Sequence, residues 1–168
     1  MPYAVIRGAC PNCEDAISSE RLELGLPCKK CLPSSTIEHS VMEKLEDRVE
    51  YVWKKLLSEG TLRKFNEVYR LNAELSDFLE FFENVTGKTP WSAQRTWAKR
   101  IIRGESFAII APTGVGKTTF LIVYSIYHAV KGRGRVYFIV PTRVLLRQVY
   151  SKILEIVNTN NLNVKVLA

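Results

Sequence analysis

Apolar residues recur at helical spacing over two successive stretches in the middle of the chain. The first covers residues 34–57 and places an apolar side chain at every third or fourth position from Ile37 to Leu56. The second covers residues 62–82 with the same spacing, and Gly60 separates the two. Such a stripe covers one face of a helix, and a short connection favours an antiparallel pair. Ser35 followed by Glu38 has the form of a capping box, so we expect the first helix to begin there.

The pattern changes after Gly87 and Pro90, where helical stretches begin to alternate with short apolar runs. We expect helices over residues 91–103, 117–130 and 142–158, strands over 106–112 and 135–141, and the start of a third strand over 163–168. Strands that alternate with helices pair in parallel. The sequence therefore predicts an α/β fold in three regions, residues 1–35, 36–85 and 86–168.

A candidate phosphate-binding loop lies between the first predicted strand and the helix after it. In such loops, backbone N–H groups at a helix start converge on phosphate oxygens. Glycine lets the backbone bend and approach, lysine contacts the β- and γ-phosphates, and a hydroxyl ligates Mg²⁺. Alanine stands where the strict G-x-x-x-x-G-K-[ST] pattern has glycine. The alternative is a glycine-rich turn, but the flanking elements favour a nucleotide site formed by Ala111, Pro112, Thr113, Gly114, Val115, Gly116, Lys117 and Thr118.

All four cysteines lie in the first 31 residues and form the pattern C-x₂-C-x₁₄-C-x₂-C. Paired knuckles of this kind hold one tetrahedral zinc ion, and Lys29 and Lys30 can offset the charge of the thiolates. Disulfides are the alternative. The N-terminus shows no basic and then apolar export signal, so we expect a cytoplasmic protein with reduced thiols. The sequence therefore predicts zinc on Cys10, Cys13, Cys28 and Cys31.

Charge is unevenly distributed along the 168 residues. Residues 1–85 carry 11 basic and 15 acidic side chains, whereas residues 86–168 carry 13 and 2, for a net charge of +7 over the chain. A half-chain this basic is typical of proteins that bind nucleotides or a nucleic-acid backbone. A basic face that meets an acidic neighbour is the alternative. No apolar run reaches the roughly 20 residues that span a bilayer, so we expect no membrane contact.

Three motifs resemble those of superfamily-two helicases. The form A-x-T-G-x-G-K-T resembles their motif I. Gln94, 23 residues before Lys117, resembles the Q-motif glutamine whose amide contacts adenine, although a helical glutamine is usually solvated. "VPTRVLLRQ" resembles motif Ia, in which Thr142 and Arg143 would contact a nucleic-acid backbone. The alternative for Thr142 is a helix cap before an ordinary basic helix.

The zinc ribbon, the helix pair, "PWSAQRTWAKRIIRGESFAIIAPTGVGKTTF" and "PTRVLLRQVY", in this order, closely resemble the N-terminus of the reverse gyrases. That family joins a superfamily-two helicase-like module to a type IA topoisomerase, uses ATP to introduce positive supercoils into DNA, and occurs in hyperthermophiles. The resemblance covers essentially the whole chain. It implies zinc on the four cysteines, ATP with Mg²⁺ at Gln94 and the phosphate loop, and DNA as a partner. Phe82 and Trp91 are the candidates for stacking on adenine.

The same resemblance refines the expected fold. Residues 1–35 would form a zinc ribbon and residues 36–85 a helical pair. Residues 86–168 would form the first, truncated part of a helicase-like ATP-binding domain, an incomplete RecA-like parallel sheet with a P-loop.

Several parts of the family's machinery have no counterpart in the sequence. There is no D-E-x-D/H motif, no second helicase core domain with its arginine finger, and no topoisomerase domain with its nucleophilic tyrosine. We therefore expect an N-terminal fragment that binds nucleotide without turning it over, with the remainder of the parent polypeptide as its partner. The alternatives are a fragment of a stand-alone superfamily-two helicase or translocase, and a non-catalytic zinc-ribbon module that binds nucleic acid.

Overall fold

A computed structural model of the chain describes residues 4–36 and 45–168. They divide into two compact units, Met1–Ser76 and Asp77–Ala168. The division falls inside helix α3 (Phe65–Thr86), so one helix contributes to both units. None of the described helices is both long and apolar enough to cross a bilayer.

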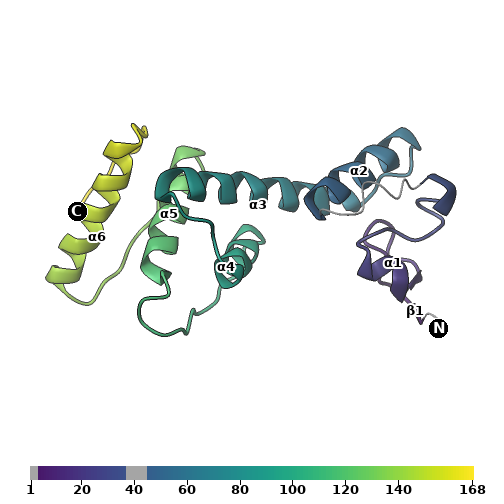
Figure 1. Ribbon diagram of the computed structural model, residues 1–168, viewed down its shortest axis with the longest axis horizontal. Helices are drawn as coiled ribbons and strands as arrows, with labels where there is room; N and C mark the ends of the chain where they lie inside the picture. Colours follow the sequence, from purple (N-terminus) through teal and green to yellow (C-terminus); the bar gives the residue numbers. More distant parts are fainter. Residues whose placement is uncertain (1–3, 37–44) are drawn as a thin grey trace. The chain divides into compact units, whose positions relative to one another are not determined.

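The first unit begins with a short hairpin and a single-turn helix. Strand β1 (Val5–Ile6) pairs antiparallel with β2 (Ile17–Ser18), Val5 opposite Ser18, and α1 (Ser19–Glu23) follows directly. In Figure 1, α1 lies beside β1 near the N-terminus. One pair of cysteines lies between the strands, and the other lies between α1 and the 3₁₀ turn η1 (Ser34–Thr36).

The helix pair expected after this region is present. Helix α2 (Leu45–Ser58) and the first part of α3 present apolar faces, and Trp53 stacks on Tyr69 with ring centroids 4.4 Å apart. The predicted capping box includes Glu38, which lies outside the described residues. Val52, Leu56 and Phe65 are buried in one core with three of the cysteines, so the helices supply the apolar area that the cysteine-rich segment lacks.

The second unit contains three further helices close to their predicted bounds: α4 (Ser92–Ile102), α5 (Lys117–Val130) and α6 (Arg143–Thr159). An aromatic cluster forms its core. The rings of Phe78, Phe120 and Tyr127 are fully buried, and Phe78 meets the other two edge-on at centroid distances of 5.8 and 5.3 Å. Trp97 brings α4 onto the same cluster, 5.4 Å from Phe120. Such edge-to-face pairs add to the stabilisation that burial provides.

The apolar segments predicted as strands have no strand partners among the described residues. The structure assigns no strand over 106–112, 135–141 or 163–168, and Ile110 and Ile139 are each 96% exposed. A helix satisfies its backbone hydrogen bonds internally, whereas a strand exists only through pairing with another segment. The helices of the α/β pattern are therefore confirmed, and the RecA-like parallel sheet stays a prediction, as do the three sequence-based regions.

Candidate metal centre and nucleotide site

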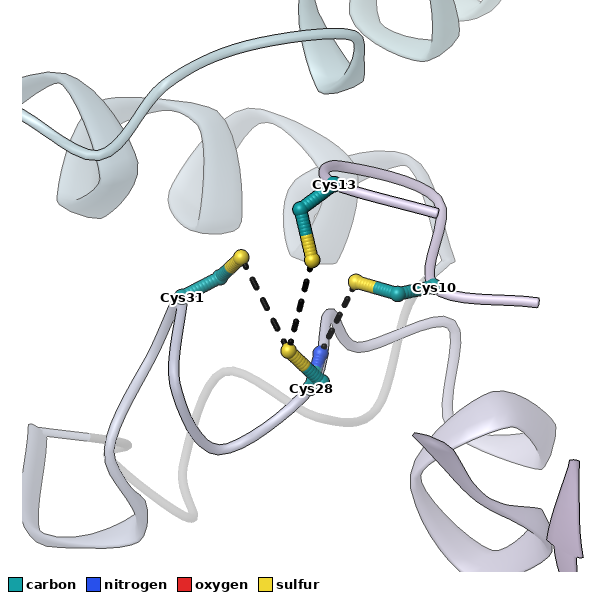
Figure 2. Close-up of side chains that lie close together, drawn as sticks. All are labelled: Cys10, Cys13, Cys28 and Cys31. Atoms are coloured by element: carbon teal, nitrogen blue, oxygen red, sulfur yellow. Dashed lines mark hydrogen bonds between the residues drawn. The ribbon is translucent and has the colours of Figure 1, made fainter. Parts of the chain in front are cut away.

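The four cysteines that the sequence singled out converge on one point. Their sulfur atoms all lie within 4.8 Å of one another, and Figure 2 shows the side chains directed at a common centre. Cys13 and Cys28 have their sulfurs 3.6 Å apart, and those of Cys28 and Cys31 are 3.7 Å apart. All four are free thiols, three of them buried. The expected cluster is confirmed, and the disulfide alternative has no support in the structure.

Tight backbone turns aim each pair at the centre. In the first knuckle the Glu14 amide donates to the Cys10 carbonyl over 2.9 Å, and in the second the amides of Cys31 and Leu32 both donate to the Cys28 carbonyl over 3.0 Å. The Cys28 amide also donates to the Cys10 sulfur over 3.2 Å, which links the two knuckles directly. An N–H···S bond of this kind stabilises a thiolate, the form that binds metal.

The pKa values of the thiols are shifted in different directions by their surroundings. Burial opposes ionisation of Cys10, but the backbone amides of Cys28, Cys13 and Asn12 prevail and lower the pKa of its thiol to about 7. Burial dominates at Cys31 and raises the pKa of that thiol to about 12. A divalent cation would favour the thiolate form of all four. Four sulfur ligands are typical of zinc sites, whereas magnesium and calcium prefer oxygen ligands.

A buried arginine lies against the second knuckle, and the sequence analysis missed it. Arg21 on α1 is 5% exposed; its Nε donates to the Pro27 carbonyl and an Nη to the Leu32 carbonyl, each over 2.6 Å. The two carbonyls flank the knuckle Cys28–Cys31, so the guanidinium fixes its ends and places a positive charge near the thiols. Lys30, to which charge compensation had been assigned, is exposed and pairs with Asp15 over 2.6 Å.

The candidate phosphate loop precedes α5 as predicted. Gly114 and Gly116 have φ values of 87° and 83°, the left-handed region that favours glycine. Lys117 is the first residue of α5, and its Nζ donates to the carbonyls of Ala111 and Pro112 over 2.6 and 2.7 Å. The ammonium group is thus folded over the loop, and the helix N-terminus lies beside it, an arrangement suited to an anion.

Gln94 lies against this loop although it stands 22 positions before Gly116 in the sequence. Its side chain is 6% exposed, its Oε1 accepts from the Trp91 amide over 3.2 Å, and its Nε2 lies 3.0 Å from the point where a Cβ on Gly116 would stand. The side chain is therefore packed in the site and not solvated. Of the two candidates for adenine stacking, Phe82 is buried against Phe78, whereas Trp91 is 45% exposed.

Thr142 and Arg143 stand at the start of α6. The Thr142 hydroxyl accepts from the Leu145 amide over 3.2 Å, which is the helix-cap arrangement named as the alternative. Arg143 is the first residue of the helix and is exposed. A cap and a backbone contact with nucleic acid are compatible, so the DNA contact stays a prediction.

Comparison with known proteins finds two families that match separate parts of the chain. Residues 1–48 match the family described as reverse gyrase zinc finger, and residues 91–168 match the DEAD/DEAH box helicase family. Over almost its whole length, the chain is similar to proteins named reverse gyrase. It is 46% identical to the reverse gyrase of Pyrococcus horikoshii over 98% of its residues, and 42% identical to reverse gyrase 2 of Aquifex aeolicus over 99%.

These relatives are much longer proteins. The chain spans 10% of the P. horikoshii protein and 13% of the A. aeolicus one. Reverse gyrase 2 of Aeropyrum pernix is similar as well, 46% identical over 89% of the chain and 12% of the relative. The matched regions thus comprise a segment similar to the reverse gyrase zinc finger and a region similar to the DEAD/DEAH box helicases.

Proposed function

We propose that the chain is the zinc- and ATP-binding part of an ATP-dependent DNA topoisomerase of the reverse gyrase type, which introduces positive supercoils into DNA. The similarity to proteins named reverse gyrase supports this function over a stand-alone helicase, and the match to a reverse gyrase zinc finger supports it over an unrelated zinc-ribbon adaptor. The chain supplies nucleotide and metal binding. The topoisomerase chemistry and the second helicase core domain come from the remainder of the parent polypeptide.

In this proposal Cys10, Cys13, Cys28 and Cys31 hold one zinc ion. The convergence of four free sulfurs within 4.8 Å supports the assignment. Zinc supplies folding energy to a segment with little apolar area of its own. The basic region after residue 86, including Thr142 and Arg143 at the start of α6, faces DNA.

The contact between Gln94 and the loop at Gly116 is the observation that carries the ATP assignment. It joins an amide that can read adenine to the backbone that receives phosphates, from two segments that are distant in sequence. Lys117 would exchange its bonds to the Ala111 and Pro112 carbonyls for charge-assisted bonds to the β- and γ-phosphates. The Thr118 hydroxyl would ligate the Mg²⁺ ion that accompanies ATP.

Nucleotide binding to the 168-residue chain tests this assignment. We expect a non-hydrolysable ATP analogue with magnesium to bind in a calorimetric titration, and Lys117→Ala to weaken binding by at least about tenfold, since one charge-assisted hydrogen bond contributes roughly 1.5–3 kcal/mol. Gln94→Ala should reduce the preference for adenine over guanine nucleotides. An unchanged preference would reject the adenine role, and unchanged affinity in Lys117→Ala would reject the loop.

The activity itself is tested in the parent protein. Lys117→Ala should abolish ATP-dependent positive supercoiling, and DNA should stimulate ATP hydrolysis by the unaltered protein. A parent protein without DNA-stimulated hydrolysis would favour the non-catalytic module.

A further inference from the structure

Asn12 lies between the first two cysteines and is fully buried, although it is polar and cannot bind zinc as readily as they do. Sequence reasoning assigned it no role. A buried amide is stable only if its donors and acceptors find partners. Besides its contacts with the Cys10 and Cys31 thiols, its partners lie at the connection between α2 and α3, some 50 residues further along the chain.

The hydrogen bonds of Asn12 cover the start of α3. Its Oδ1 accepts from the amides of Arg63 and Phe65 over 2.8 and 3.4 Å, and its backbone carbonyl accepts from the Lys64 amide over 3.1 Å. Its Nδ2 donates to the Thr61 carbonyl over 2.9 Å. The first amides of a helix have no partner within the helix. They are usually capped by the residue just before it, whereas here the cap comes from a metal knuckle.

The second knuckle holds the same segment. The Thr61 hydroxyl donates to the Cys31 carbonyl over 2.9 Å. Phe65, which is 1% exposed, belongs to the same buried cluster as Cys10 and Cys28. We call residues 61–65 the latch segment. It is bonded to both cysteine knuckles, so its hydrogen bonds depend on how the two knuckles lie relative to each other.

We propose that metal binding at the four cysteines controls the order of the latch segment and of the first turn of α3, with Asn12 as the positioning residue. Zinc fixes the separation of the two knuckles. The hydrogen bonds from the latch segment to Asn12 and to the Cys31 carbonyl can form together only at that separation. Thermodynamic coupling is reciprocal, so the latch contacts must in turn raise the affinity for zinc. The inference rests on the zinc site of the proposed function and extends the metal's effect to a helix that contains no ligand.

Hydrogen exchange in the 168-residue chain tests the coupling directly. Backbone amide exchange is measured by NMR with zinc bound and after its removal by a chelator, with zinc release quantified separately. We expect the amides of Arg63, Lys64 and Phe65 to exchange at least about tenfold faster without metal, because each loses its acceptor. The amides of Val123 and Tyr127 in α5, which lie in the other unit, should not change.

Variants test the reverse direction, from latch to metal. Zinc affinity is measured by competition with a chromophoric chelator, and cobalt(II) spectra report whether four thiolates still ligate. Asn12→Ala removes the latch bonds together with the contact of Asn12 with the Cys31 thiol, so it should weaken zinc by about 10–100-fold while the tetrathiolate spectrum is retained. Thr61→Val should weaken it in the same way, and Thr61→Ser, which keeps the hydroxyl, should restore it.

Glu14→Gln is the matched control. It removes the ion pair to Lys64, which also joins the first knuckle to the latch segment but is exposed on both sides. Exposed pairs contribute little, so we expect less than about a threefold change in zinc affinity.

The outcomes separate this inference from the function on which it rests. If zinc is released and the three latch amides keep their protection, or if Asn12→Ala and Thr61→Val bind zinc as tightly as the unaltered chain, the coupling is overturned and the zinc site stands. If Asn12→Ala does not fold, the exchange measurement and the Thr61 pair decide. If no zinc binds to the chain at all, both proposals fall.

Discussion

Gly116 offers a quantitative test of the contact between the phosphate loop and Gln94. Its φ of +83° is one that an L side chain rarely adopts, and an added Cβ would meet the Gln94 Nε2 at 3.0 Å. Gly116→Ala should therefore lower the free energy of unfolding for two reasons, backbone strain and a steric clash. Gly132, just after α5, has a φ of +67° with nothing within 4 Å of its Cβ position, so Gly132→Ala has the strain alone.

The two substitutions should differ by the steric cost. Strain at a left-handed position costs about 1–2 kcal/mol, and the reduced freedom of the unfolded chain returns about 0.4–1 kcal/mol of it. We therefore expect Gly132→Ala to lower the free energy of unfolding by roughly 1 kcal/mol. Overpacking adds about 1–3 kcal/mol, and the Gln94 amide has little room to retreat because it is buried and bonded to the Trp91 amide. Gly116→Ala should thus lower the free energy of unfolding by about 2–4 kcal/mol.

Urea denaturation of the 168-residue chain measures these differences, and a double-mutant cycle assigns the excess. Combining Gly116→Ala with Gln94→Ala should recover the steric part, about 1–3 kcal/mol, because the truncated side chain no longer meets the new methyl group. Equal costs for Gly116→Ala and Gly132→Ala would refute the contact. So would an excess that persists in the Gln94→Ala background.

Three further predictions concern the metal centre and the aromatic core. Zinc must displace protons from thiols, so zinc affinity should decrease as the pH is lowered. Because the pKa of Cys10 is lowered to about 7, the decrease should become steeper below pH 7. A plot of zinc affinity against pH with a constant slope would contradict this. Cys28→Ser should release zinc, and a one-to-one metal content would exclude Cys28 as a ligand. Tyr127→Phe removes a 2.7 Å hydrogen bond to Asp77, which still keeps its ion pair with Lys131. The substitution should lower the free energy of unfolding by about 1 kcal/mol. An unchanged free energy of unfolding would mean that this hydrogen bond contributes no net stabilisation.

The helices and the cysteine cluster followed from local sequence. Helices α4, α5 and α6 lie within a residue or two of their expected bounds, because their hydrogen bonds and apolar stripes involve residues three or four apart. The cysteine spacing predicted the cluster because each C-x₂-C turn places both sulfurs on one side through local backbone bonds.

Strand formation and the burial of aromatic rings depended on tertiary contacts that the local sequence pattern does not predict. The apolar segments around Ile110 and Ile139 have strand character in sequence, but pairing decides whether a strand forms. The exposure of an aromatic ring depends equally on packing: Phe82 entered the core and Trp91 did not.

Charge compensation at the thiols shows the same limit. Proximity in sequence favoured Lys29 and Lys30, whereas the buried cation is Arg21, which reaches the second knuckle from α1.

Sequence by itself determined which segments are helical, which four side chains can share a metal ion, and which loop can receive a phosphate, since each depends on interactions within a few residues. The helicase resemblance placed Gln94 with the phosphate loop, but only the tertiary structure decided that Asn12 caps α3 and that the Gln94 Nε2 packs against Gly116. Both contacts join segments tens of residues apart. A single buried amide is satisfied by whichever backbone groups the fold brings to it, and its own sequence neighbourhood carries no trace of which groups those are.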